Sequence, residues 1–166
     1  MKGIVIKYEK NNIDTDLIIP ARYLVSSDPQ YLAEHCMEDL DPNFNQKLKE
    51  HGYSILVAGS NFGSGSSREQ APLAIKSAGI QCVVAPSFAR IFFRNSINIG
   101  LPIIEFKHIG ELRTGHVLDI DLLEGTLENI TTSNSFDIAK MPPFLQEIIS
   151  SSGLLNFARK KIDGKN

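Results

Sequence analysis

Residues 53–86 read "YSILVAGSNFGSGSSREQAPLAIKSAGIQCVVAP", and this stretch contains the clearest indication of the fold. Two apolar runs, residues 53–59 and 80–86, have the length and composition of buried strands. Between them lie a loop rich in glycine and serine and a segment of helical periodicity, residues 68–79, which ends at Gly79. The order strand, loop, helix, strand predicts a right-handed βαβ unit in a parallel sheet.

The same alternation continues in both directions along the chain. Downstream, residues 87–100 have the spacing of a second helix, and residues 101–106 have the character of a further strand. Toward the N-terminus we expect four elements: a strand at 3–8, an extended piece at 16–20, a helix at 26–40 capped by Asp28, and a polar connection at 41–52.

Beyond residue 106 the pattern changes. Residues 116–139 predict two or three short strands joined by turns at "EG" (124–125) and "SN" (133–134). Residues 142–162 start with proline, have helical apolar spacing and end in basic residues, which is typical of a C-terminal helix. The predicted fold is therefore one α/β domain over residues 1–166, with a parallel-sheet core, helices and an added β portion.

Composition excludes several functional classes. Hydrophobic content of 42% and charged content of 22% over 166 residues are ordinary for a soluble globular protein. A net charge of −2 provides no basic surface for nucleic acid or for a membrane, and no apolar run approaches the roughly 18–20 residues of a membrane span. The N-terminus "MKGIVIKYEK" lacks the features of a signal peptide, so we expect a cytoplasmic protein.

The two cysteines, Cys36 and Cys82, form neither a CxxC pair nor a disulfide framework. An iron–sulfur cluster generally requires three or four thiolates. We therefore expect no metal site or cofactor in this chain alone.

The loop at residues 59–67 contains three glycines and four serines, and three familiar motifs fail to match it. A P-loop would need Gly-Lys, which is absent here. In the dinucleotide motif GxGxxG, Gly63 and Gly65 match, but Arg68 occupies the third glycine position, and no acidic residue ends the next strand. The nucleophile elbow GxSxG matches in no register.

Two interpretations of the loop remain open from the pattern alone. In the first, glycines such as Gly65 let the backbone approach a small anion, and Ser66 and Ser67 stand at a helix start where free N–H groups favour negative charge. Arg68 then adds a bidentate donor for a carboxylate or phosphate. In the second, the loop is a solvated turn with a serine N-cap and an acidic first helical turn.

Three blocks of sequence resemble the swivelling domain of the aconitase superfamily: "NFGSGSSRE" (61–69), "SFARIFFRNSINIGLPII" (87–104) and "NNIDTDLIIPARYL" (11–24). They occur in the family's order, and the resemblance covers nearly the whole chain. The length is similar to that of the free-standing small subunits of the 3-isopropylmalate dehydratase and homoaconitase group. The resemblance implies a swivelling β/β/α domain.

The resemblance also implies roles for individual residues. Ser66 corresponds to the catalytic base, which works as an alkoxide, and Ser67 and Arg68 correspond to the residues that bind a substrate carboxylate. Asp16 is expected near the active site, where it supports groups of the large subunit. An Asx-turn at the end of a strand is the alternative interpretation of this "DTD" stretch.

The reaction implied by the resemblance is the loss of water beside a carboxylate, followed by rehydration with the hydroxyl moved by one carbon. In this family a [4Fe–4S] cluster acts as the Lewis acid. By resemblance the cluster belongs to a separate large subunit, so the expected partners are that subunit and a small dicarboxylate. The chain is expected to be inactive alone, and its self-association stays open.

Substrate choice rests on "ARYLVSSDP", residues 21–29, which in this group forms a loop over the variable arm of the substrate. Members that handle an extra carboxylate tend to have arginine after "YL", whereas Val25 stands here and suits a branched alkyl arm. This favours 3-isopropylmalate over homocitrate or citrate. Ser26 and Ser27 depart from the larger residues often found there and leave citramalate and 2,3-dimethylmalate open. A non-catalytic carboxylate-binding module is the alternative class.

Four further residues lie on the predicted helix at 87–100. Arg90 and Arg94 are expected to pair with acidic loops, because they share one helix face. Phe92 and Phe93 are expected in the core. The four histidines are scattered in polar sequence and receive no predicted role.

Overall fold

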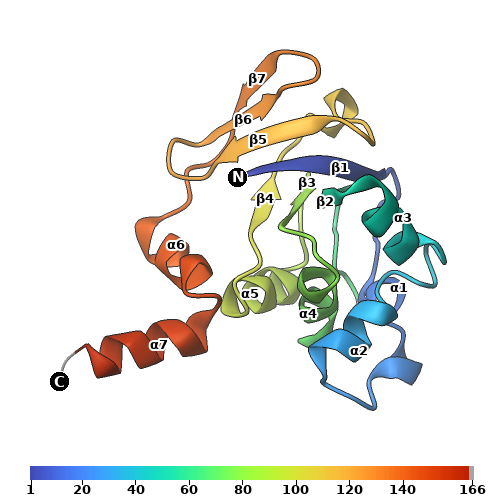
Figure 1. Ribbon diagram of the computed structural model, residues 1–166, viewed down its shortest axis with the longest axis vertical. Helices are drawn as coiled ribbons and strands as arrows, with labels where there is room; N and C mark the ends of the chain where they lie inside the picture. The colour runs from blue at the N-terminus through green and yellow to red at the C-terminus, as the bar shows by residue number, and fades with distance from the viewer. Residues whose placement is uncertain (165–166) are drawn as a thin grey trace.

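The computed structural model describes residues 1–164 and contains a seven-stranded sheet in the order β4-β3-β2-β1-β5-β6-β7 (Figure 1). Strands β1 to β4 are parallel, and β5 to β7 extend the sheet from β1 as antiparallel neighbours. The strands are β1 (Lys2–Tyr8), β2 (Tyr53–Ala58), β3 (Cys82–Ala85), β4 (Ile103–Glu105), β5 (Val117–Asp121), β6 (Thr126–Asn129) and β7 (Asn134–Asp137).

Helices and two short 3₁₀ turns complete the described chain. They are α1 (Thr15–Ile18), η1 (Ala21–Tyr23), α2 (Pro29–Glu34), α3 (Phe44–His51), α4 (Gln70–Ser77), α5 (Arg90–Asn98), η2 (Ile109–Glu111), α6 (Pro143–Ser150) and α7 (Leu154–Asp163). No helix among residues 1–164 is both long enough and apolar enough to cross a membrane.

The predicted βαβ alternation is confirmed from β2 through α4, β3 and α5 to β4. Helices α4 and α5 lie side by side on one side of the parallel strands, and β5 to β7 lie on the opposite side of the molecule (Figure 1). Because β1, β2 and β3 are parallel, the loops that follow them emerge at one common edge of the sheet.

Side chains of the parallel strands alternate between two apolar cores. Leu56 and Val83 point into the larger core, which the helices complete. Ile55 and Cys82 point into the smaller core, which β5 and β6 help to enclose. A shift of one residue in strand pairing would exchange the two sets of side chains between the cores, so the packing of each core determines the register.

The antiparallel addition is also confirmed. Gly125, in the predicted "EG" turn, has φ +73° and its N–H donates to the carbonyl of Asp121. Ser133, in the predicted "SN" turn, has φ +60° and precedes β7. Positive φ at these two positions lets the chain reverse sharply between neighbouring strands.

The extended piece predicted at 16–20 is wrong, because the chain forms the short helix α1 there. The Asp14 carboxylate accepts a hydrogen bond from the N–H of Leu17 at 2.9 Å and caps this helix. The apolar run before Pro20 resembles a strand, but its residues turn inward, and Ile18 and Ile19 are fully buried.

Two predictions between residues 26 and 52 need correction. The helix capped by Asp28 ends at Glu34 instead of continuing to residue 40, because Met37 adopts φ +61° and its N–H donates to Ile18. The supposed polar connection contains the helix α3, whose Phe44 and Leu48, four residues apart, are buried. Two apolar residues were too weak a signal to reveal this helix.

The predicted C-terminal helix is divided into α6 and α7 at Ser152 and Gly153, which have φ +60° and +121°. The N–H of Gly153 donates to the carbonyl of Ile148 and ends α6. A Cβ atom on Gly100 would lie 2.8 Å from the Gly153 nitrogen, so the turn between α6 and α7 packs closely against the end of α5.

The buried carboxylate of Asp41 joins α3 to the end of β1, and this contact predicts a pH dependence of stability. Burial acts to raise the pKa of Asp41, but hydrogen bonds from Lys47, Tyr8 and the N–H of Asn43 outweigh burial and lower it. A lowered pKa stabilises the fold at pH values above the ordinary carboxyl value, and this stabilisation is lost as the pH falls through the folded-state pKa.

We therefore expect Asp41→Asn to lower the free energy of unfolding by about 1–3 kcal/mol at pH 7. The difference from the wild type should shrink as the pH falls below about 4. Urea unfolding at several pH values measures this, with Glu9→Gln at the exposed Lys7 pair as a control that changes little. A difference that is independent of pH would contradict the assignment.

Candidate active site

Three segments meet at the edge of the sheet where β1, β2 and β3 end. The N–H of Gly63 donates to Ile13 at 2.8 Å, and the N–H of Thr15 donates to Ser64 at 2.8 Å. On the other side of the loop, Phe62 exchanges backbone hydrogen bonds with Ser87 and Ala89 at 3.1 and 3.0 Å. The three blocks that carry the family resemblance therefore lie together in space, with the Gly/Ser loop in the middle.

Thr15 also holds the Gly/Ser loop through its side chain. This residue is 2% exposed, and its hydroxyl donates to the backbone carbonyl of Ser66 at 3.0 Å. The contact fixes the backbone of Ser66 and leaves the Ser66 side chain exposed at the surface, beside the exposed Ser67.

The two glycines of the loop serve different purposes. Gly63 has φ +77°, and a Cβ atom there would lie 2.1 Å from the ring of Phe92 on α5, so the backbone itself packs against that ring. Gly65 has φ +90°, and a Cβ atom there would find ordinary contacts at 3.4 Å with Asp14 and Thr15. Close packing therefore requires a glycine at 63, whereas backbone conformation favours one at 65.

Helix α4 begins at Gln70, later than the predicted residue 68, so Ser66 and Ser67 lie in the loop ahead of the helix. Glu69 occupies the N-cap position, and no side chain makes a capping hydrogen bond there in the described structure. The interpretation of the serines as simple helix caps is therefore wrong, and so is the expectation that Ser66 and Ser67 stand directly at a helix start.

Arg68 and Asp16 are brought together across the two loops. The Nη1 atom of Arg68 lies 2.7 Å from the Asp16 carboxylate and donates to the carbonyl of Ile19 at 3.0 Å. The Arg68 side chain is 12% exposed, while that of Asp16 is 58% exposed. A guanidinium has five N–H donors, and the contacts of Arg68 with Asp16 and Ile19 within residues 1–164 both use Nη1.

The Asx-type contact considered for the "DTD" stretch belongs to Asp14, the N-cap of α1. Asp16 is instead the ion-pair partner of Arg68. Sequence reasoning also missed Thr15 between them, whose buried hydroxyl is the direct link to Ser66. A threonine flanked by two aspartates has no spacing signal that distinguishes it from a surface residue.

Val25 lies in the short connection between η1 and α2, and its side chain is 85% exposed. The chain reaches this connection directly from Ile19, whose carbonyl accepts the Arg68 hydrogen bond. Val25 is therefore placed on a neighbouring loop instead of among Ser66, Arg68 and Asp16.

The cysteines do not fit an iron–sulfur cluster. Cys36 lies in the larger core and Cys82 in the smaller one, and both thiols are buried. Burial raises the pKa of both thiols, that of Cys82 to about 12, which disfavours the thiolate that a cluster requires. Within residues 1–164 no group of three or more histidine, cysteine, aspartate or glutamate side chains is arranged to hold a metal ion.

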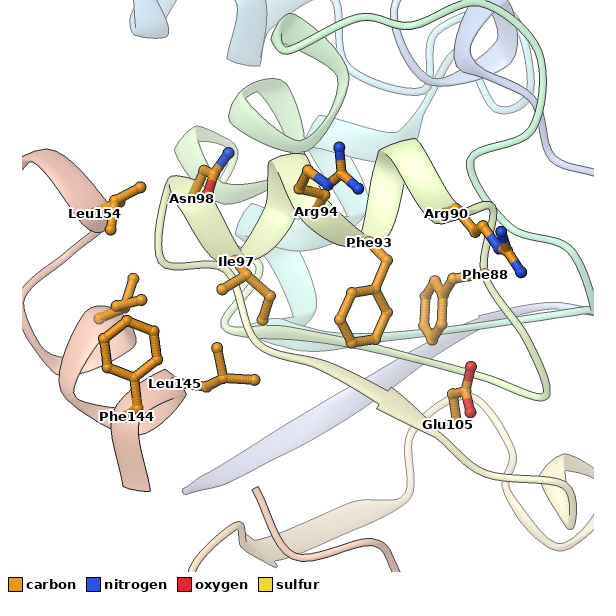
Figure 2. Close-up of a pocket in the computed structure, with 11 residues that line it drawn as sticks. Phe88, Arg90, Phe93, Arg94, Ile97, Asn98, Glu105, Phe144, Leu145 and Leu154 are labelled. Carbon is orange, nitrogen blue, oxygen red and sulfur yellow. The ribbon is translucent and has the colours of Figure 1, made fainter. Parts of the chain in front are cut away.

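A cavity of about 600 Å³ lies on the outer side of α5, between that helix and α6 (Figure 2). Arg90 and Arg94 line it, and neither forms an ion pair with any residue from 1 to 164, so the expected pairing with acidic loops is wrong. Phe92 is buried as predicted, but Phe93 points into this cavity and is 37% exposed.

Residues 1–109 match the family model described as the aconitase C-terminal domain. This match covers the three blocks of sequence that meet at the edge of the sheet. The class of the protein is thus an aconitase-type α/β domain, in agreement with the predicted fold class.

Relatives and a solved structure define the family more closely. A 3-isopropylmalate dehydratase small subunit from Caldanaerobacter subterraneus is 53% identical over 163 residues, which cover 98% of this chain and 99% of that protein. One from Halothermothrix orenii is 55% identical and covers 93% of both chains. The crystal structure of 3-isopropylmalate dehydratase (leuD) from Methanocaldococcus jannaschii has a TM-score of 0.88 at 43% identity and covers 99% of this chain and 97% of that one. The chain belongs to the family of 3-isopropylmalate dehydratase small subunits.

The close contact at Gly63 predicts a large effect of adding one methyl group. We expect Gly63→Ala to lower the free energy of unfolding by about 2–4 kcal/mol, because the new atom overlaps the Phe92 ring in addition to the backbone strain. Thermal unfolding measures this loss.

Gly115→Ala is the matched control, because Gly115 also has positive φ (+89°) but has no atom within 4 Å of a built Cβ. In this control the free energy of unfolding should fall only by the cost of the backbone strain, about 1–2 kcal/mol. Equal losses at the two positions would show that contact with Phe92 does not determine the loop conformation.

Proposed function

We propose that this chain is the small subunit of a cytoplasmic 3-isopropylmalate dehydratase and interconverts 2-isopropylmalate and 3-isopropylmalate together with a separate large subunit. The observation that supports this most is the meeting of Ser66, Arg68 and Asp16 at one edge of the sheet. This arrangement occurs in a chain that matches 3-isopropylmalate dehydratase small subunits over nearly its full length.

In this proposal Ser66 is the base that removes a proton beside the substrate carboxylate. Serine is a poor base at its ordinary pKa, so the alkoxide needs nearby cationic and N–H donors. Arg68, two residues away, contributes positive charge. The Thr15 contact to the Ser66 carbonyl keeps the backbone in place, so the Ser66 hydroxyl alone moves to meet the substrate.

Arg68 and Ser67 bind a carboxylate of the substrate, and the backbone at Gly65 allows close approach. The Nη2 and Nε edge of Arg68 suits bidentate recognition, because Asp16 and Ile19 engage Nη1 and hold the guanidinium in one orientation. Asp16 is thus a positioning residue. Its partly exposed carboxylate also faces the side from which groups of a large subunit would arrive.

The proposed site is half of an active site. Removal of the hydroxyl needs a Lewis acid, which we assign to a [4Fe–4S] cluster of the large subunit, because Cys36 and Cys82 of this chain do not fit one. What this chain contributes is the base, the carboxylate clamp and the loop bearing Val25. Exposure of Ser66 and Ser67 supports this division, since another subunit must cover them to exclude water.

Val25 contacts the isopropyl arm of the substrate in this proposal. An apolar side chain at that position gains by excluding water from a branched alkyl group and offers no partner to an additional carboxylate. Homoaconitate, citramalate and 2,3-dimethylmalate are the competing substrates to test.

We expect Ser66→Ala to reduce the kcat for 3-isopropylmalate by about 10²–10⁴-fold, the range for loss of a general base. The assay is anaerobic turnover by the chain reconstituted with its large subunit. Ser60→Ala, in the same loop, is the control and should leave kcat unchanged. An assembled Ser66→Ala enzyme with normal activity would rule out the assigned base.

Isothermal titration of the isolated chain tests the non-catalytic class. If this chain contains only half of the active site, it should bind a dicarboxylate weakly. A stand-alone binding module should instead bind it strongly without a partner.

We expect Val25→Arg to shift the preference of the reconstituted enzyme toward a tricarboxylate such as homoaconitate. The guanidinium supplies a partner for the extra carboxylate and removes the apolar contact, and the change should be about 10-fold or more in the ratio of kcat/KM values. Gln30→Arg places the same charge on the exposed surface of α2, outside the loop at residues 21–29, and should leave the ratio nearly unchanged. An unaltered ratio in Val25→Arg would contradict the assignment of this position.

A further inference from the structure

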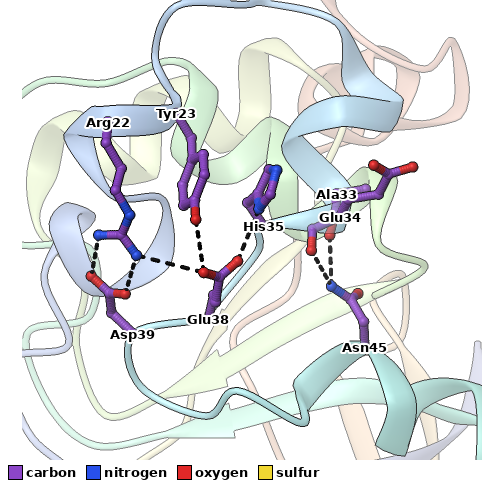
Figure 3. Close-up of polar contacts among 8 residues, drawn as sticks. All are labelled: Arg22, Tyr23, Ala33, Glu34, His35, Glu38, Asp39 and Asn45. Carbon is purple, nitrogen blue, oxygen red and sulfur yellow. Dashed lines mark hydrogen bonds and ion pairs between the residues drawn. The ribbon is translucent and has the colours of Figure 1, made fainter.

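The five-residue connection that bears Val25, residues 24–28, is held at both ends by one polar cluster. We name Arg22, Tyr23, His35, Glu38 and Asp39 the brace; Figure 3 shows them side by side, with Asn45 nearby. Arg22 and Tyr23 precede the connection, and the other three residues follow α2. The two ends of the connection are thus joined through side chains that are distant from Ser66 in the sequence.

The first end is fixed by Arg22. Its guanidinium forms a two-pronged contact with both carboxylate oxygens of Asp39, and its Nη2 atom lies 3.6 Å from Glu38. The same guanidinium lies 4.6 Å from the centre of the Tyr23 ring. A planar, bidentate contact of this kind restricts orientation as well as distance.

Glu38 connects that end to His35. One of its oxygens accepts a hydrogen bond from the Tyr23 hydroxyl at 2.8 Å, and the other lies 2.9 Å from His35 Nδ1. The rings of Tyr23 and His35 are stacked, with centroids 3.7 Å apart and 6° between their planes. Hydrogen bonds from His35 and Tyr23 lower the pKa of Glu38, which keeps it charged.

The second end of the connection leads into α2. Asp28 caps this helix by accepting from the N–H of Tyr31 at 2.8 Å, and the Ser26 hydroxyl accepts from the N–H of Asp28 at 3.1 Å. The Tyr31 ring packs edge-on against His35, with centroids 4.9 Å apart. His35 therefore contacts the residues on both sides of the connection.

The brace itself rests on fixed parts of the fold. The side-chain amide of Asn45 on α3 donates to the carbonyls of Ala33 and Glu34, which secures the end of α2. The N–H of Met37 donates to Ile18, which joins the turn after α2 to α1. Leu24, the first residue of the connection, packs against the larger core, whereas Val25 is 85% exposed.

We propose that Tyr23, His35 and Glu38 are positioning residues that determine substrate specificity by holding the Val25 connection over the variable arm of the substrate. This inference rests on the proposed function. Because these residues stand apart from Ser66, their loss should weaken recognition of the arm and leave the chemical step intact. The effect should appear in KM and in the choice between substrates.

The test uses Glu38→Ala in the chain reconstituted with its large subunit. We compare 2-isopropylmalate with citramalate, which has a methyl group in place of the isopropyl arm on the same carbon. The ratio of their kcat/KM values should fall about tenfold, mainly because the isopropyl substrate acquires a higher KM, while kcat stays within about twofold. Tyr23→Phe removes the hydroxyl and keeps the ring stack, so it should change the ratio less but in the same direction. This variant provides the test if Glu38→Ala fails to fold.

Glu34→Ala is the matched control, since Glu34 is on α2 and its side chain contacts Gln30 and no member of the brace. It should leave the substrate ratio unchanged. An unchanged ratio in Glu38→Ala, or an equal loss on both substrates, would overturn the proposal, even if Glu38→Ala also lowers Tm.

Hydrogen exchange of the amides of residues 24–28 separates this inference from the proposed function, because it requires no turnover. The brace predicts faster exchange in Glu38→Ala than in the wild type or Glu34→Ala. Equal exchange in all three proteins would show that the brace does not hold the connection, and it would overturn this inference. A wild-type pair that converts neither substrate overturns the proposed function alone.

Discussion

The backbone hydrogen bonds between Thr15 and Ser64 and between Gly63 and Ile13 are the constraint on which the site depends. They join two loops that lie about fifty residues apart in sequence, so their formation closes a long segment and orders glycine-rich backbone, both of which oppose folding entropically. Burial of β1 and β2 on both faces of the sheet offsets this loss and delivers the two loops to the same edge. The glycine-rich loop is therefore held in one conformation by its hydrogen bonds to the loop that contains Ile13 and Thr15.

That arrangement explains how a glycine-rich loop can position reactive groups. Gly63 allows the backbone to rest on Phe92, and Thr15 holds the carbonyl of Ser66. Backbone restraint combined with side-chain exposure suits a surface that another subunit covers, because the base of the proposed function would already be placed before the partner arrives. The buried cysteines, by contrast, contribute only to the two cores.

The sequence predicted most reliably what depends on long apolar runs. The strands at 53–59 and 80–86 are buried on both faces, and no local preference competes with that signal. The helices α1 and α3 were missed because a single carboxylate cap makes the first, and two buried residues four apart make the second. The brace was invisible for another reason: stacking and ion pairing involving His35 arise from a positive-φ turn at Met37, which sequence patterns do not reveal.

In the proposed function, Arg68 links the binding of the substrate carboxylate to the choice of substrate. Its Nη1 atom contacts both Asp16 and the carbonyl of Ile19, and Ile19 leads directly through Pro20 into η1, where the brace begins. A change that tilts the guanidinium therefore shifts the start of the Val25 connection as well as the carboxylate clamp. Because Arg68 contacts the residue that leads into η1 and Glu38 contacts Tyr23 of η1, their effects on substrate preference should depend on each other instead of adding independently. Ser66, which is held through Thr15, lies outside this coupling, so in the proposed function the proton-removing group is separate from the elements that select the substrate.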